Sequence, residues 1–254
     1  MDIFLLVGII LGFFSVVVGM IVKGADVTVL INPAAIIIIF VGLIAALINS
    51  FPSSDIKRLP KIFGVLFKNK TYDKAAMVGT IVELSNQARR DGLLSLENSV
   101  QSLEDPFLKK GLEMVVDGID PDQIQEIMES EIEGIEERHQ TAANMFITAG
   151  STSPTLGVLG AVIGLIGALG NLNDVDALGH MISAAFVATL YGIFFGYVLF
   201  QPFGSRLKRK SAEEIDSMWL ILEGVMSIQA GQSPKTIEQK LYSAIEPSQR
   251  PKER

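Results

Sequence analysis

Four long runs of apolar residues alternate with polar segments along this chain. The runs cover residues 3–22, 27–50, 141–170 and 181–203. Each is long enough for a helix that crosses the hydrocarbon core of a bilayer, which is about 30 Å thick and needs about 20 apolar residues. None of the four contains Asp, Glu, Lys, Arg or His. The pattern therefore predicts four transmembrane helices.

The polar segments carry the signals of further helices. Asp105-Pro106 and Asp120-Pro121 each place an N-cap residue before a proline suited to the first helical position, and Gly118 suits a helix end. From residue 121 to 139, apolar side chains recur at helical spacing opposite an acidic face. The apolar set is Ile124, Ile127, Met128, Ile132 and Ile135; the acidic set is Glu126, Glu129, Glu133, Glu136 and Glu137.

The C-terminal region predicts a helix over residues 205–230, a short one opening at Ser233-Pro234, and a disordered tail over 247–254. No segment shows a strand pattern. We therefore expect an all-α, polytopic membrane protein with a helical cytoplasmic region. Its predicted parts are spans one and two (1–52), a cytoplasmic helical loop (53–140), spans three and four (141–204), and C-terminal helices with the tail (205–254).

The distribution of basic residues predicts the orientation. Lys and Arg gather after the second run (57, 58, 61, 68, 70) and after the fourth (206, 208, 209, 210). The connector before the second run has only Lys23, and the one before the fourth has Asp174 and Asp176. The positive-inside rule then places both termini and the long loop in the cytoplasm. No basic segment precedes the first run and no small-residue cleavage site follows it, so we interpret this run as a retained span.

Composition excludes several classes of function. The net charge of −7 disfavours a nucleic-acid partner, and the chain has no cysteine. The two histidines, His139 and His180, lie on opposite sides of the predicted membrane, so they make no multi-histidine metal site. The glycines at 157, 160, 164, 167 and 170 lie inside a span without the lysine of a phosphate-binding loop, and they suit helix packing. We expect no enzymatic activity, metal or cofactor.

The missing intramembrane charge leaves two possibilities. Proton relays and ion sites in membranes usually use a buried ionisable side chain. A chain without one either moves no ions, as a structural scaffold would, or forms a wall around a carboxylate that a partner supplies. A transporter acting alone is disfavoured.

A few uncharged features of the spans have two interpretations. Pro154 and Pro202 each remove a helical hydrogen bond, which leaves a carbonyl for a cation or merely kinks the helix. Thr189 is a hydroxyl in an apolar run, and such a group most often bonds its own helix. The small residues of the third run favour close packing within one subunit or between subunits (Gly157, Ala161, Gly164, Ala168).

The cytoplasmic loop contains a charge cluster around Gly92-Leu93-Leu94. Arg89, Arg90 and Asp91 precede these residues and Glu97 follows them. Such charges are either a solvated face or a surface that steers a complementary partner.

Strings along nearly the whole chain resemble the MotA/PomA family of flagellar stator proteins. They are ARRDGLLSLE at 88–97, SPTLGVLGAVIGLI at 153–166, AAFVATLYG at 184–192 followed by Pro202-Phe203, and EGV at 223–225 with IEQKL at 237–241. They occur in the family's order. The resemblance implies an ion-conducting subunit that converts ion motive force into torque on the rotor. An energiser of envelope transport of the ExbB/TolQ type is the alternative.

The resemblance also implies partners and residue roles. Family members form a homo-oligomeric ring, a pentamer, around a dimer of a single-span MotB-type subunit whose aspartate binds the ion. By matching position, Pro154 and Pro202 couple ion passage to movement, and Ala161 and Thr189 line the ion path, where we also place Tyr191.

The rotor protein FliG would contact Arg89 and Glu97, with Arg90 adjacent. Sodium-driven members tend to have threonine where this chain has Ala161, so the sequence favours protons, with sodium as the alternative.

Overall fold

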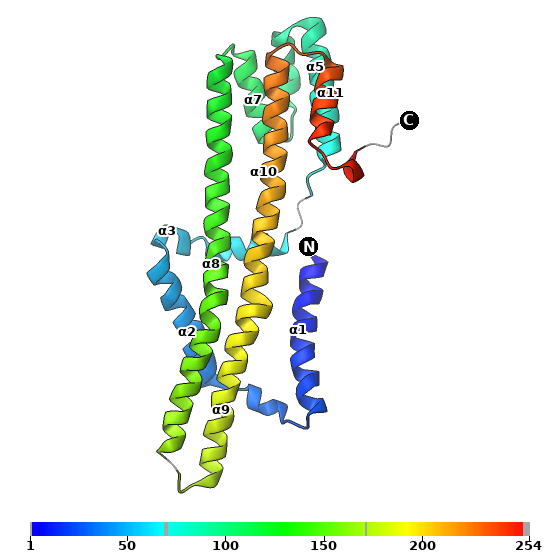
Figure 1. Ribbon diagram of the computed structural model, residues 1–254. Coiled ribbons are helices and arrows are strands. Elements are labelled where there is room, and N and C mark those ends of the chain that lie inside the picture. The colour runs from blue at the N-terminus through cyan, green and yellow to red at the C-terminus, as the bar shows by residue number, and fades with distance from the viewer. Residues whose placement is uncertain (1, 69–70, 171, 251–254) are drawn as a thin grey trace. The chain divides into compact units, whose positions relative to one another are not determined.

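The computed structural model describes residues 2–68, 71–170 and 172–250, and within these ranges every regular element is helical (Figure 1). The chain divides into two compact units, each made of two separate stretches. The span unit comprises residues 1–69 and 139–209, and the loop unit comprises residues 70–138 and 210–254. These boundaries differ from the predicted ones because two long helices, α8 (Pro121–Leu169) and α10 (Gln201–Gln229), each contribute to both units.

The span unit contains the helices that are long and apolar enough to cross a membrane. It begins with α1 (Ile3–Val22), the 3-10 turn η1 (Val27–Leu30), α2 (Pro33–Ser50), α3 (Ser53–Ile56) and α4 (Leu59–Phe67). It continues with the apolar half of α8 (Pro121–Leu169), then α9 (Val175–Ile193), the π-helix η3 (Phe194–Phe200) and the start of α10 (Gln201–Gln229). Four candidate spans result, as predicted.

Two of the spans begin or extend differently from the prediction. The second run is not one helix, because Asn32 caps α2 and Pro33 takes its first position, so residues 27–30 form a separate 3-10 turn. The third span is the second half of α8, a single helix of 49 residues. The boundary predicted near residue 140 is absent because no helix-breaking residue lies there, and the helix accommodates Pro154.

The loop unit contains α5 (Lys74–Asp91), η2 (Leu93–Leu96), α6 (Glu97–Gln101), α7 (Pro106–Val116), α11 (Pro234–Ser243) and the turn η4 (Pro247–Gln249). The polar half of α8 and the later part of α10 complete it. The predicted caps are present: Asp105 accepts from two amides of α7, and Ser233 accepts from the amide of Thr236. Gly118 follows α7 with φ of 72°.

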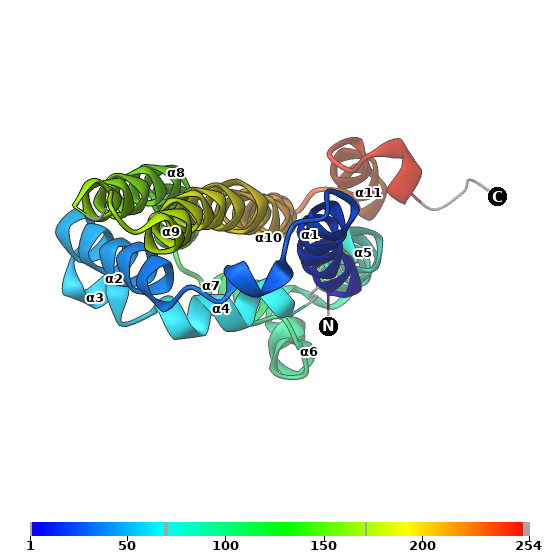
Figure 2. The same cartoon turned by 90° about the horizontal axis from the view of Figure 1, so that it is seen from below.

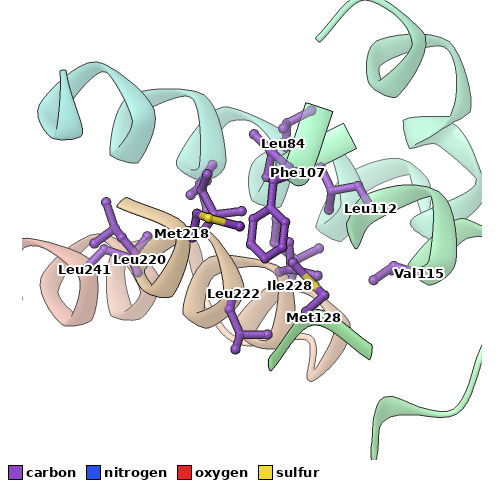
Figure 3. Packing of buried hydrophobic residues seen from close by; sticks show 14 of the residues in the cluster. Leu84, Phe107, Leu112, Val115, Met128, Met218, Leu220, Leu222, Ile228 and Leu241 are labelled. Carbon is purple, nitrogen blue, oxygen red and sulfur yellow. The ribbon is translucent and has the colours of Figure 1, made fainter. Parts of the chain in front are cut away.

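A hydrophobic core holds the loop unit together (Figure 3). Leu112, Met128 and Ile221 are almost fully buried in it, and burial of each such side chain contributes about 1.5–3 kcal/mol. Of the apolar face predicted on residues 121–139, Ile124 and Ile132 are buried, whereas Ile127 is 40% exposed. The predicted tail begins with the ordered turn η4, and residues 251–254 lie outside the described ranges.

Candidate functional site

The centre of the span unit is a contact between α8 and α9 in which backbone touches backbone. A β-carbon at Gly157 would lie 2.9 Å from the carbonyl oxygen of Ala188, and one at Gly192 would lie 2.7 Å from that of Ser153. At Gly196 it would lie 2.7 Å from the oxygen of Gly150. These distances are too short for a real β-carbon, so glycine is required there. Gly150 and Gly157 of the third run therefore pack helices within this subunit, one of the two interpretations of the pattern.

The position of α2 defines the two flanks of this helix pair (Figure 2). On α8, a β-carbon at Gly160 would lie 3.6 Å from Ile38, and the side chain of Leu156 covers Gly42 of α2. On α9, the carbonyl of Ala184 accepts a hydrogen bond of 3.2 Å from Asn32, which caps α2. One flank of both helices is therefore covered by α2.

Pro154, Ala161 and Thr189 share the opposite flank. A helix turns by about 100° per residue. If directions around the axis of α8 are measured from Gly157, which contacts α9, Pro154 and Ala161 lie on one side of it and Leu156 lies on the other. If directions around the axis of α9 are measured from Gly192, which contacts α8, Thr189 lies on one side of it and Ala184 lies on the other. All three side chains are half-buried. The structure thus brings three of the five predicted ion-path residues to one face, which we call the path face.

The path face is almost apolar. The Thr189 hydroxyl donates to the carbonyl of Ala185 in its own helix, at a long 3.4 Å. That back-bond is the common behaviour of threonine in an apolar helix. Ala161 presents a methyl group. Neither residue brings a charge to the face.

Tyr191 points to the other flank and is not brought together with these three residues. Its hydroxyl donates to the carbonyl of Leu30 in η1, and its ring meets that of Phe195 edge-on at 5.7 Å. It also lines an apolar cavity of about 170 Å³ with Phe13 and Phe40. In this structure Tyr191 joins η1 to α9.

Pro202 and Pro154 border an element that the sequence did not predict, the π-helix η3. The amide of Gln201 donates to the carbonyl of Gly196, five residues earlier, and the next residue, Pro202, has no amide hydrogen to donate. A β-carbon at Gly196 would lie 2.9 Å from the ring of Pro154. The widened turn therefore packs directly on the proline of α8. Pro202 itself is exposed.

The charged residues of the loop unit lie around η2. Arg89 and Arg90 are in the last turn of α5, where positive charge is favourable at a helix C-terminus. Glu97 is the first residue of α6. All three are exposed. Glu97 also borders a hollow of about 220 Å³, lined in addition by Val100, Gln101, Glu113, Val116 and Asp117.

Two groups outside the spans have shifted acidity. Burial raises the pKa of Tyr72 above its ordinary value, and a hydrogen bond to Glu214 raises it further. The Thr28 hydroxyl and amide, which both donate to the carboxylate of Asp26 before η1, lower the pKa of Asp26. Within the described ranges, no three His, Cys, Asp or Glu side chains gather closely enough to hold a metal ion.

Two family models match the chain. Residues 6–92 match the motility protein A N-terminal family, and residues 99–219 match the MotA/TolQ/ExbB proton channel family. Among curated relatives, Motility protein A of Bacillus subtilis is 52% identical over 237 residues, 93% of this chain and 88% of that protein. The chemotaxis protein PomA of Vibrio alginolyticus is 30% identical over 98% of both chains.

Solved structures agree with these matches. The structure of the flagellar MotAB stator complex from Bacillus subtilis contains a chain that superposes with a TM-score of 0.89, at 50% identity over 96% of both chains. The C. jejuni MotAB structure gives a TM-score of 0.92 at 34% identity over 97% of both chains.

Proposed function

Because this chain belongs to the MotA/TolQ/ExbB proton channel family, and is a flagellar stator subunit, we propose that it forms an ion path together with a MotB-type partner. The single observation that carries the proposal is the path face. It gathers Pro154, Ala161 and Thr189 on the flank of α8 and α9 away from α2, and it has no ionisable group. A face of that kind suits a wall around a carboxylate supplied by another chain.

The match of residues 6–92 to the N-terminal family of motility protein A favours this function over an ExbB/TolQ-type energiser. The proposed assembly is a pentameric ring of this chain around a MotB-type dimer, in the bacterial inner membrane with both termini in the cytoplasm. The solved relatives are described as complexes of MotA with MotB, which supports the choice of partner.

The conversion of ion motive force into torque requires that ion passage be coupled to helix movement. One charge that crosses 100 mV releases about 2.3 kcal/mol, several times the thermal energy. Pro154 against the π-helix η3 is a place where such movement could be transmitted, because the usual hydrogen bonds are already replaced there. The exposed Arg89, Arg90 and Glu97 of the loop unit would then engage FliG by charge.

The ion that we propose is the proton. A proton travels on the partner's carboxylate and needs no cage of oxygen ligands, and Ala161 offers none. Thr189 would be the one hydroxyl of the path face that sodium could use, and it is already bonded to Ala185.

The experiment is swimming speed at fixed pH in a strain that has this chain and its partner as the only stator. The sodium concentration is titrated, with and without a protonophore. We expect a speed that is independent of sodium and abolished by the protonophore. Speed that rises with sodium and survives the protonophore would show that the path carries sodium. Absence of swimming in a strain where both proteins are made and inserted would contradict the stator assignment to this pair.

A further inference from the structure

The turn η2 exposes one leucine and buries its neighbours. Leu96 is fully buried, and Leu93 packs at the edge of the core of the loop unit. Leu94, between them, is 74% exposed. Single exposed leucines are common on protein surfaces. What distinguishes Leu94 is the rigidity of the turn that presents it and the charges that surround it.

The turn is held from inside by the side chain of Gln87. The amide nitrogen Nε2 of Gln87 donates to the carbonyl of Ser95 at 2.7 Å, and its oxygen Oε1 accepts from the hydroxyl of Ser99 at 2.8 Å. The hydroxyl of Ser95 donates to the carbonyl of Gly92 at 2.6 Å. One glutamine on α5 therefore braces both η2 and the start of α6.

The backbone adds to this bracing. Gly92 has φ of 84°, in the left-handed region that favours glycine, and it ends α5 sharply. Leu93 and Leu96 then attach the turn to the hydrophobic core of the loop unit. A surface held in this way loses little conformational freedom when a partner binds, so more of the contact energy remains as affinity.

The surroundings of Leu94 have the layout of a binding hot spot. Arg89, Arg90 and Asp91 lie before the turn and Glu97 lies directly after it, all exposed. An apolar side chain at the centre with charges at the rim is the arrangement that concentrates binding energy at one residue, while the rim sets orientation.

We propose that Leu94 is the apolar anchor of the rotor contact and that Gln87 is its positioning residue. The proposal rests on the proposed function, which directs this loop toward FliG. Charge complementarity defines the occupant: a protein surface with an apolar pocket, acidic on the side that meets Arg89 and Arg90 and basic on the side that meets Glu97.

The test compares Leu94→Ser with Leu94→Met and with Ile127→Ser in the full complex with the MotB-type partner. Ile127 is the matched control, because it is an exposed apolar residue of the loop unit that lies on α8, outside the turn η2. The readouts are the number of fluorescently tagged complexes at each motor and the proton flux of the plug-free complex in liposomes. We expect Leu94→Ser to weaken recruitment about tenfold with unchanged flux, and the two other variants to behave as wild type.

Gln87→Ala tests the positioning role, with Asn86→Ala as control because the Asn86 side chain donates to the carbonyl of Val82 within α5. We expect Gln87→Ala to lower recruitment severalfold and to leave the torque of each recruited complex unchanged, because the anchor itself remains. Normal recruitment with Gln87→Ala would overturn the positioning role.

Arg89→Glu separates failure of this inference from failure of the proposed function. If Arg89→Glu lowers recruitment and Leu94→Ser does not, the anchor is wrong and the rotor contact stands. If neither variant changes recruitment, the rotor contact lies elsewhere. Both the rotor contact proposed for Arg89, Arg90 and Glu97 and the anchor proposed for Leu94 are then wrong. If Leu94→Ser lowers flux as much as recruitment, Leu94 supports the structure of the complex, which also overturns the anchor.

Discussion

At the scale of single residues, the structure shows which bonds a side chain makes and on which flank of its helix it lies. The hydroxyl of Thr189 could bond its own helix or line a path; the structure shows the bond to Ala185 and places the residue on the path face. Tyr191 was predicted with the ion path, yet its hydroxyl bonds Leu30 on the opposite flank. Helical spacing could have indicated the difference, because residues 189 and 191 point about 200° apart.

The acidity of Tyr72 gives a prediction for the loop unit. Its folded-state pKa is raised by burial and by the hydrogen bond to Glu214. Its contribution to stability is therefore fully present below the ordinary tyrosine pKa of about 10 and is lost as pH rises through the raised value. Thermal scans of the purified complex between pH 9 and 11 should show a Tm that falls less steeply for Tyr72→Phe than for wild type. Tyr242→Phe is the control, and equal slopes for all three proteins would reject the assignment.

At the scale of elements, caps were predictable and changes of helix type were not. Asp105, Asp120 and Ser233 predict helix N-termini because their side chains accept hydrogen bonds from the free backbone amides of the first turn. The π-helix η3 depends on contacts that the local sequence does not contain, above all the packing of Gly196 on Pro154. The continuity of α8 was missed because polarity changes near residue 140 while helix propensity does not.

The glycine contact between α8 and α9 predicts a large effect of one methyl group. Gly192→Ala would press a β-carbon onto backbone atoms of Ser153 and Gly157, which cannot rotate away. We expect a loss of about 1–3 kcal/mol of stability. We also expect α8 and α9 to move apart at the path face. Gly179→Ala on the same helix meets open space and should be neutral or slightly stabilising. The measurement is the Tm of each detergent-solubilised complex; equal values would contradict the close contact.

At the scale of the whole molecule, the sequence indicated four spans and a polar helical loop, but not how the chain divides. Hydropathy detects spans because lipid requires about 20 apolar residues in succession. It does not reveal that each compact unit combines two distant stretches, since that depends on which faces of α8 and α10 are buried.

The proposed orientation is testable by single cysteine labels, because the natural chain has no cysteine. Asn98→Cys lies on α6, and Asn173→Cys lies between α8 and α9. A membrane-impermeant maleimide added to intact spheroplasts should label position 173 and not position 98, which should react only after lysis. Labelling of position 98 in intact spheroplasts would reverse the topology.

The most direct test of the central claim is proton flux in liposomes, because the claim is that this chain forms a wall and that a partner supplies the charge. Three samples are compared with empty liposomes: the chain alone, the chain with a plug-free MotB-type partner, and the same complex with the membrane aspartate of the partner changed to asparagine. We predict flux above background only in the second sample, since none of the four predicted spans of this chain contains Asp, Glu, Lys, Arg or His. Flux through the chain alone, at the level of the complex, would contradict the account.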